Sequence, residues 1–176
     1  MINQFFSQPF YISNFNSSLI ELSYSTNRKW ESNTITSKDN RNELTKKSYE
    51  ILINELFKYT KEIISKDHKI DLLEIWANEY LEKDFQEQHI HPGSHFSFTI
   101  IHKSPPGSGR LKFYNPYENF GLCYEEIFCN YYHFVEEPKQ EENTIIIWPS
   151  YMRHMVTPGT NKTKRITYSG NFKIII

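Results

Sequence analysis

The sequence has few cysteines, and they cannot form a disulfide framework. Cys123 and Cys129 are the two cysteines among 176 residues, and one small bridge is the most they could make. We expect buried free thiols, which fit a reducing compartment. No apolar stretch approaches the ~18–20 residues that a membrane helix needs, and the first residues lack the basic start and apolar segment of a secretory signal. The sequence therefore predicts a cytoplasmic protein with no membrane segment.

An excess of charge of either sign is absent as well. Lys and Arg total 20, Asp and Glu total 21, and the formal net charge is -1. A near-neutral chain lacks the electrostatic footprint of a nucleic-acid-binding protein, so we expect no nucleic-acid partner. Aromatic residues, in contrast, make up 16% of the chain. Each ring buries roughly 150–250 Å², which supplies the core of a folded domain and excludes disordered, collagen-like and coiled-coil classes.

One segment, 48–65, has the apolar spacing of an amphipathic helix. Phe57 and Ile63 lie on its expected apolar stripe, and Glu55 lies on the expected solvent-facing side. Thr45 is a candidate N-cap. This helix is expected to support one side of a sheet.

Most other predicted elements are strands, because apolar residues alternate or run between turn residues. A short strand is expected at 19–25. After Asp71 the expected strands are 72–80, 84–91, 95–103, 110–114, 144–148, 152–157 and 165–176. This count predicts a mainly β fold with helical support (α+β), a β-sandwich or barrel, and a double-stranded jelly roll of the cupin-like kind fits it.

We expect one domain over 1–176, in which 1–70 is N-terminal strand and helix support and 71–176 is the jelly-roll core. The segment 117–143 has no clean period and reads as a long loop, which is usually functional or mobile in a compact domain. Its aromatic part, 117–135, is the candidate lid over a substrate. An exposed edge strand near the N-terminus is compatible with a homodimer.

Three histidines are candidate metal ligands. His89 and His91 are two residues apart on an expected strand and so share one face. His154 begins a late strand, which in a jelly roll can lie across the barrel mouth from an early one. Three protein ligands leave positions open on an octahedral metal for substrate and dioxygen. The alternative is that these histidines are ordinary polar residues on strand surfaces.

The last strand carries a candidate anion site. Arg165, Thr167 and Ser169 share one strand face, and a guanidinium with a neighbouring hydroxyl can hold a carboxylate. An inward-facing arginine needs an anion, because an unpaired buried charge is costly. A dicarboxylate co-substrate would provide one. The alternative is an edge-strand arginine that faces water.

Several runs in the C-terminal two thirds together resemble a known family. They are Trp76-Ala77-Asn78, 88–94 (QHIHPGS), 105–116 (PPGSGRLKFYNP), 147–151 (IWPSY), 154–156 (HMV) and 165–172 (RITYSGNF). In this order and spacing they are similar to the 2-oxoglutarate/Fe(II) oxygenases of phages and marine bacteria, in the prolyl-hydroxylase-like superfamily. The resemblance covers roughly residues 70–173.

This resemblance implies a double-stranded β-helix with Fe(II) at the barrel mouth and 2-oxoglutarate as co-substrate. It implies that His89 and His154 are metal ligands, that His91 stands where the superfamily has a carboxylate, and that Arg165 binds the distal carboxylate of 2-oxoglutarate. The further co-substrate contacts that it implies are Asn78 and Thr167 or Ser169.

The chain departs from the family pattern at two places. His91 replaces the usual Asp or Glu ligand, and Glu87 is the carboxylate that could complete the site instead, since a regular strand puts it on the face of His89. Ile100-Ile101 stand where the family often carries a tyrosine that contacts the co-substrate.

The leading functional hypothesis is therefore an Fe(II)- and 2-oxoglutarate-dependent dioxygenase. It would hydroxylate a C–H bond of an unknown substrate, for which the resemblance suggests a peptide or protein side chain. One alternative is a three-histidine dioxygenase that does not use 2-oxoglutarate. Another is a non-catalytic jelly-roll module whose aromatic residues bind carbohydrate. Since metal-bound histidine must be neutral, we expect iron affinity to fall below about pH 6.

Overall fold

The computed structural model describes residues 8–25, 28–29, 34–116 and 135–176. Both cysteines and the expected lid, apart from Val135, lie outside these residues. One α-helix is described, α1 (Lys46–Ile63), and one short 3-10 helix, η1 (Ser17–Leu19). The strands are β1 (Tyr11–Asn14), β2 (Leu22–Ser23), β3 (Arg28–Lys29), β4 (Ile35–Thr36), β5 (Glu43–Leu44), β6 (Lys69–Tyr80), β7 (Gln86–His89), β8 (Phe96–Lys103), β9 (Leu111–Tyr114), β10 (Val135–Glu136), β11 (Thr144–Pro149), β12 (His154–Val156) and β13 (Arg165–Ile175).

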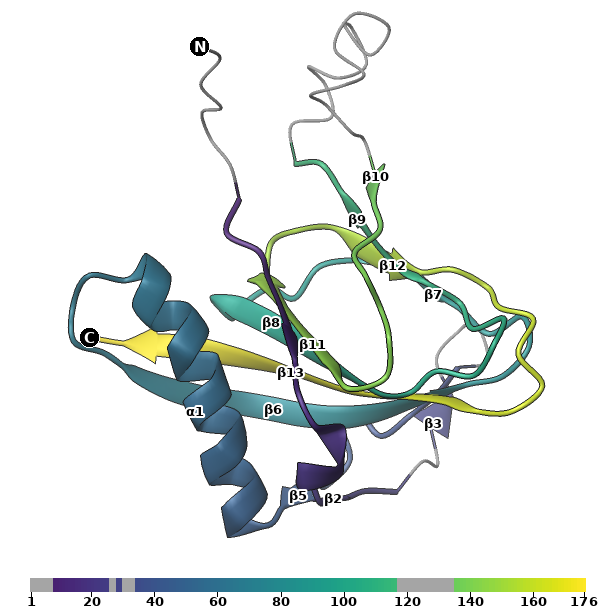
Figure 1. The fold of residues 1–176 in the computed structure, drawn as a ribbon, viewed down its shortest axis with the longest axis horizontal. Coiled ribbons are helices and arrows are strands. Elements are labelled where there is room, and N and C mark those ends of the chain that lie inside the picture. The colour runs from purple at the N-terminus through teal and green to yellow at the C-terminus, as the bar shows by residue number, and fades with distance from the viewer. Residues whose placement is uncertain (1–7, 26–27, 30–33, 117–134) are drawn as a thin grey trace, which may run out of the picture.

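The strands form two main sheets, and α1 packs against the face of the larger sheet that is turned away from the smaller one (Figure 1). The larger sheet has seven strands in the order β1-β11-β8-β13-β6-β4-β3, and the smaller has four in the order β10-β9-β12-β7. Strands β2 and β5 form a separate pair. The prediction of a mainly β fold with helical support is confirmed. No helix among the described residues is long and apolar enough to cross a membrane.

The large sheet has two faces with different partners, because successive side chains of a strand point to opposite sides. In β11, Ile145 and Ile147 join the core that contains α1, whereas Ile146 and Trp148 join the core beneath the small sheet. We call these the outer core and the inner core. The outer core contains Phe15, Ile20, Leu52, Leu56, Tyr59, Ile75, Ala77, Phe98, Ile100, Ile145, Ile147, Tyr168 and Phe172. The inner core contains Tyr80, Leu111, Phe113, Ile146, Trp148, Met152 and Val156.

The predicted N-cap of the helix is confirmed, but the helix lies two residues earlier than the predicted 48–65 and buries a different side. Thr45 is the N-cap, and its side chain accepts a hydrogen bond from the Ser48 amide. The expected apolar residues Phe57 and Ile63 are 37% and 42% exposed, whereas Glu55 is only 6% exposed. That part of the stripe prediction was wrong. Glu55 tolerates burial because its carboxylate accepts a hydrogen bond from the Tyr11 hydroxyl and pairs with the Lys58 ammonium.

The seven strands expected after Asp71 are all present, with ends within three residues of the predicted ones. The strand expected at 19–25 was mostly wrong, because η1 takes its first residue and β2 keeps only Leu22–Ser23. The N-terminal support also contributes to the large sheet, where β1 pairs with β11 and β4 pairs with β6. This pairing brings the residues just after β4 to the inner face of the sheet.

Candidate metal and co-substrate site

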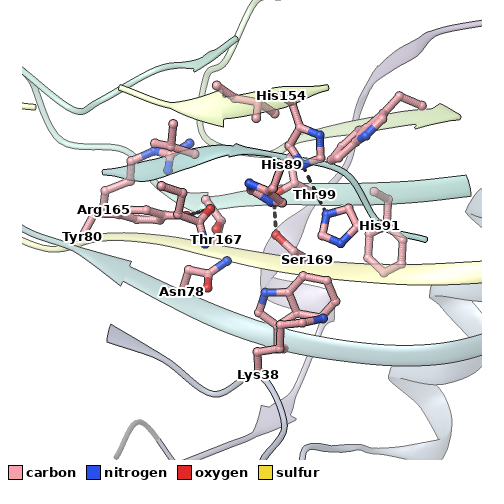
Figure 2. Close-up of a pocket in the computed structure, with 16 residues that line it drawn as sticks. Lys38, Asn78, Tyr80, His89, His91, Thr99, His154, Arg165, Thr167 and Ser169 are labelled. Atoms are coloured by element: carbon pink, nitrogen blue, oxygen red, sulfur yellow. Dashed lines mark hydrogen bonds between the residues drawn. The ribbon is translucent and has the colours of Figure 1, made fainter. Parts of the chain in front are cut away.

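The small sheet brings the three candidate histidines together (Figure 2). His89 and His154 are direct partners in the β7–β12 register, and their ring centres are 4.3 Å apart. His91 follows β7, and its Nε2 lies 3.2 Å from His154 Nε2. One nitrogen from each ring can be chosen so that all three lie within 4.8 Å of one another. Among the described residues this is the group of His, Cys, Asp or Glu that could hold a metal ion.

Backbone contacts orient two of the three rings. The Nδ1 atom of His89 lies 2.6 Å from the Glu87 carbonyl, and Nδ1 of His154 lies 2.9 Å from the Met152 carbonyl. A carbonyl only accepts, so each Nδ1 carries the proton and each Nε2 keeps its lone pair. A hydrogen bond from the second ring nitrogen to a carbonyl is the usual support of a metal-binding histidine.

Burial keeps these histidines neutral. It lowers the pKa of His91 to about 2 and that of His154 to about 3, and the neighbouring imidazoles add to the effect. Burial lowers the pKa of His89 as well. The neutral imidazole is the form that binds a metal. The group therefore offers three ligand nitrogens without first having to lose protons at neutral pH.

Glu87 does not belong to this group. The register of β7 against β12 shifts between the pairs His154–His89 and Val156–Gln86, so three steps along β7 match two along β12. Such a β-bulge changes which residues share a face. Gln86 consequently lines the same pocket as His89, and Glu87 does not. The regular-strand argument that paired Glu87 with His89 therefore fails at this bulge.

The opposite end of the pocket contains a buried cation. Arg165 is 2% exposed, and its Nη1 has no hydrogen-bond partner among the described residues. Its guanidinium carbon lies 4.8 Å from the centre of the Tyr80 ring. Burial lowers the pKa of Arg165, and the adjacent Tyr80 opposes this shift. A buried guanidinium with a free N–H group is suited to a carboxylate ligand.

The other predicted co-substrate residues line the same pocket. Thr167 is directly opposite Asn78 in the β13–β6 register, and the buried Asn78 Oδ1 also has no hydrogen-bond partner in the described part of the chain. The Ser169 hydroxyl contacts the Thr99 hydroxyl at 3.1 Å. The alternation predicted for Arg165, Thr167 and Ser169 therefore carries all three to one pocket, and none of them faces bulk water as an edge residue would.

The sequence reasoning missed several residues that line the pocket, among them Tyr80, Lys38 and Trp148. Tyr80 donates a hydrogen bond from its hydroxyl to Gln86 Oε1 at 2.8 Å. Lys38 lies with its Nζ 4.0 Å from the centre of the Trp76 ring. Trp148 has a buried indole N–H without a partner among the described residues. Tyr80 and Trp148 end strands that were predicted, so their alternation could have indicated an inward direction. Nothing around Lys38 in the sequence indicates its place.

The donor set fits a divalent metal and an anionic co-substrate. Three neutral imidazoles suit Fe(II) and related ions, and the unpartnered Arg165 Nη1 suits a carboxylate. A jelly-roll arrangement with a histidine group at one end of a pocket and a buried arginine at the other is that of the non-haem, metal-dependent oxygenases that bind a 2-oxo acid. Residues 74–171 match the family described as "Putative 2OG-Fe(II) oxygenase". The chain belongs to this family of 2-oxoglutarate- and Fe(II)-dependent oxygenases.

Solved structures agree on the fold. HygX from Streptomyces hygroscopicus, solved with nickel, 2-oxoglutarate and hygromycin B bound, has a TM-score of 0.58 at 7% identity, over 94% of this chain and 83% of HygX. A Pseudomonas putida prolyl-4-hydroxylase has a TM-score of 0.56 at 9% identity, over 95% and 93% of the two chains. A Trichoplax adhaerens prolyl hydroxylase, in complex with a peptide fragment of a hypoxia inducible factor, scores 0.53 at 11% identity, over 94% and 84%.

These likenesses confirm the double-stranded β-helix predicted from the resemblance. No curated protein sequence matches the chain.

Proposed function

We propose that this protein is an Fe(II)- and 2-oxoglutarate-dependent hydroxylase in which His89, His91 and His154 hold the iron. Arg165 binds the distal carboxylate of 2-oxoglutarate. The observation that carries this proposal is a single pocket lined both by the three-histidine group and by a buried guanidinium with an unpartnered Nη1. A metal site alone would not need that arginine, and a carbohydrate-binding surface would need neither.

The residues of the chain would hold the metal and orient the co-substrate. The imidazoles of His89 and His154 are fixed by their Nδ1–H hydrogen bonds to backbone carbonyls. Asn78, Thr167 and Ser169 offer polar atoms along the pocket between the two ends. When bound, Fe(II) with 2-oxoglutarate activates dioxygen for hydroxylation of a C–H bond.

The inner core keeps water from one side of the site. The rings of Trp148 and Phe113 lie 5.0 and 5.7 Å from the His154 ring, centre to centre, and His154 is 3% exposed. A dry wall strengthens electrostatic contacts inside a pocket. The ring of His91 lies on the Trp76 side of the pocket, and this side is where we expect the primary substrate to approach.

The substrate that we propose is a peptide or protein side chain. The support is the fold shared with a prolyl-4-hydroxylase and with a prolyl hydroxylase in complex with a peptide fragment. We further propose that the enzyme works in the cytoplasm, consistent with its two cysteines, and that it could form a homodimer through an edge strand such as β1. A size measurement in solution tests the dimer.

The first experiment is anaerobic addition of Fe(II) and then of 2-oxoglutarate, followed by visible absorption. A 2-oxo acid chelated to Fe(II) gives a broad charge-transfer band, so the band is the expected result. Iron binding without the band would favour a three-histidine dioxygenase that does not use 2-oxoglutarate. A protein that binds no metal would contradict the proposal and leave a jelly-roll binding module.

Two variants test the assignments at the two ends of the pocket. His154→Ala should lose the iron and the band together. Arg165→Ala should keep the iron but weaken 2-oxoglutarate binding by about 10–100-fold, the value of a charge-assisted hydrogen bond of ~1.5–3 kcal/mol. Arg41→Ala is the matched control, since its side chain is 89% exposed. Equal 2-oxoglutarate affinity in Arg165→Ala and wild type would overturn the co-substrate site.

A further inference from the structure

His91 is held differently from the other two histidines of the group. His89 and His154 lie in paired strands, and each ring has a backbone carbonyl at Nδ1. His91 lies beyond the end of β7, and the hydrogen-bond contact of its ring in the described structure is the one to His154. What holds His91 therefore acts mainly through its main chain and through contacts with neighbouring rings.

Two serines hold the main chain of His91. Its amide N–H donates to the Ser150 carbonyl at 3.0 Å. Its carbonyl accepts from the Ser94 hydroxyl, also at 3.0 Å. The Ser94 hydroxyl is in turn 2.8 Å from the Ser150 hydroxyl. The His91 N–H therefore contacts Ser150 directly, and the His91 carbonyl is linked to Ser150 through Ser94. Ser150 follows β11 and is 1% exposed.

From Ser150 the contacts run across the inner face of the large sheet. The Ser150 hydroxyl is 2.8 Å from that of Ser97, and Ser97 donates to Asn171 Oδ1 at 2.7 Å. Asn171 Nδ2 then donates to Glu74 Oε1 at 2.6 Å. Ser97, Asn171 and Glu74 are direct partners on β8, β13 and β6. They therefore form one cross-strand row, in which side chains are close enough to interact.

The cross-strand row is linked back to His91 through the Lys38 ammonium and the Trp76 ring. Glu74 pairs with the Lys38 ammonium, with Nζ to oxygen distances of 3.0 and 3.1 Å. The same ammonium lies over Trp76, and the Trp76 ring centre is 5.7 Å from that of His91. The contacts thus close on themselves. We call this set the His91 circuit, and its members are His91, Ser94, Ser150, Ser97, Asn171, Glu74, Lys38 and Trp76.

The charge at Glu74 gives the circuit a direction. Ionised Glu74 only accepts, so Asn171 must turn its Nδ2 toward Glu74 and its Oδ1 toward Ser97. Ser97 must then donate to Asn171, and it can only accept from Ser150. Ser97 and Asn171 are 1% and 3% exposed, and a buried polar group that loses its partner costs free energy. Ser150, which donates to Ser97, then accepts from Ser94, and the single Ser94 hydroxyl hydrogen is shared between the Ser150 hydroxyl and the His91 carbonyl.

We propose that the His91 circuit positions the third metal ligand, and that Ser97 is a positioning residue that acts through His91 without touching the metal. This inference rests on the proposed function, since it takes His91 to be a ligand. It assigns a role to the serines of the HPGS and WPS runs, which neither the metal nor the co-substrate site uses.

Co(II) binding to the purified full chain tests the proposal, with visible absorption as a second readout of the ligand geometry. Ser97→Ala should weaken Co(II) binding by up to about tenfold, the lower end of the range for direct partners of a metal ligand, because it acts through Ser150, and it should change the Co(II) spectrum. The decisive comparison is a double-mutant cycle with His91→Ala. In the His91→Ala background, Ser97→Ala should have no further effect on Co(II) affinity.

Two further variants guard against a loss of fold. Ser48→Ala removes a hydroxyl that is 1% exposed and hydrogen-bonded at the start of α1, and it should leave Co(II) affinity unchanged. Glu74→Gln alters the half-exposed end of the circuit and should weaken Co(II) binding by about threefold, below the range for direct partners, and only when His91 is present.

The outcomes separate the two proposals. Equal losses from Ser97→Ala with and without His91, or no loss in either Ser97→Ala or Glu74→Gln, would overturn the circuit and leave the proposed function standing. A wild-type protein that binds no Co(II) and no Fe(II) would overturn the proposed function, and the circuit with it.

Discussion

The two faces of the large sheet belong to the same strands, but one packs apolar side chains and the other lines a polar pocket. On the outer face, β6, β8, β11 and β13 present Ile, Phe and Ala side chains to α1, and most of these are fully buried. On the inner face the same strands present polar side chains to a pocket. Three buried polar atoms there, on Asn78, Trp148 and Arg165, have no hydrogen-bond partner among the described residues.

This difference separates stability from function. Burial of apolar area stabilises a fold by roughly 25 cal/mol per Å², whereas a buried polar atom without a partner costs free energy. The apolar contacts of the outer core therefore stabilise the fold, whereas the unpartnered polar atoms of the pocket lower its stability until a ligand satisfies them. Substitutions on the two faces should have opposite consequences.

The largest expected effect on stability is at the outer core. Leu56 is fully buried between α1 and the sheet, and Leu56→Ala should lower the free energy of unfolding by about 2–5 kcal/mol. Chemical denaturation measures this loss. Iron and 2-oxoglutarate affinities, measured where the variant is folded, should stay at wild-type values. A parallel loss of 2-oxoglutarate affinity would show that the two faces are not independent.

On the inner face, removal of the buried Arg165 charge should raise the free energy of unfolding. Arg165→Met keeps most of the side-chain volume and removes a buried guanidinium whose Nη1 has no hydrogen-bond partner among the described residues. The metal-free protein should become more stable by about 1–3 kcal/mol, while 2-oxoglutarate binding is weakened as in Arg165→Ala. Thermal or chemical denaturation without ligands provides the measurement. A lower stability would mean that Arg165 contributes more to the fold, through Tyr80 for example, than its burial costs.

The stability of the metal-free protein should depend on pH through the histidine group. Burial lowers the folded-state pKa of His91 to about 2 and of His154 to about 3, below the unfolded value of about 6.5. Between the folded and the unfolded pKa values, the unfolded state binds more protons than the folded state. The contribution to stability is therefore full above about pH 6.5 and falls as the pH falls. The slope should be up to about 1.4 kcal/mol per pH unit for each histidine.

Denaturation curves between pH 6.5 and 5 measure this slope before most carboxylates titrate. His154→Ala should make it shallower, and an unchanged slope would contradict the assignment. The same lowered pKa values shift the expected loss of iron affinity to a lower pH. The sequence predicted a fall below about pH 6 from unperturbed histidines, and the buried group should instead keep its iron to a lower pH.

The smallest effect concerns the start of α1 on the outer side. Thr45→Ala removes the hydroxyl that caps the Ser48 amide and should cost about 1 kcal/mol of stability. Thr45→Ser retains a capping oxygen and should cost less. The visible spectrum of the iron complex should be the same in both variants. A changed spectrum would link the helix to the pocket across the sheet.

Much of the site could be predicted because strand alternation is a local property. His89, His91 and His154 were chosen from spacing and order, and Arg165, Thr167 and Ser169 from one strand face, and the structure brings all of them to one pocket. Glu87 could not be judged in the same way. Its face depends on a bulge that forms where β7 pairs with β12, and a bulge in one strand is decided by its partner.

The residues that were missed depend on contacts between distant parts of the chain. Lys38 reaches the pocket because β4 adds to the edge of β6, and two paired residues are too short a signal to read from sequence. Glu55 is buried because its partner, the Tyr11 hydroxyl, arrives from β1. The amphipathic pattern around Glu55 describes the helix, but it does not say which neighbour will satisfy the carboxylate.

The sequence by itself determined the seven strands after Asp71, the helix and the residue types of the chemistry. Alternation, capping and ligand identity depend on residues that are neighbours in the sequence. Only the tertiary structure decided that the histidines meet, that Glu87 is excluded and that the serines link His91 to Lys38. Those outcomes depend on register between strands far apart in the chain, and register is set by the packing of whole faces against each other.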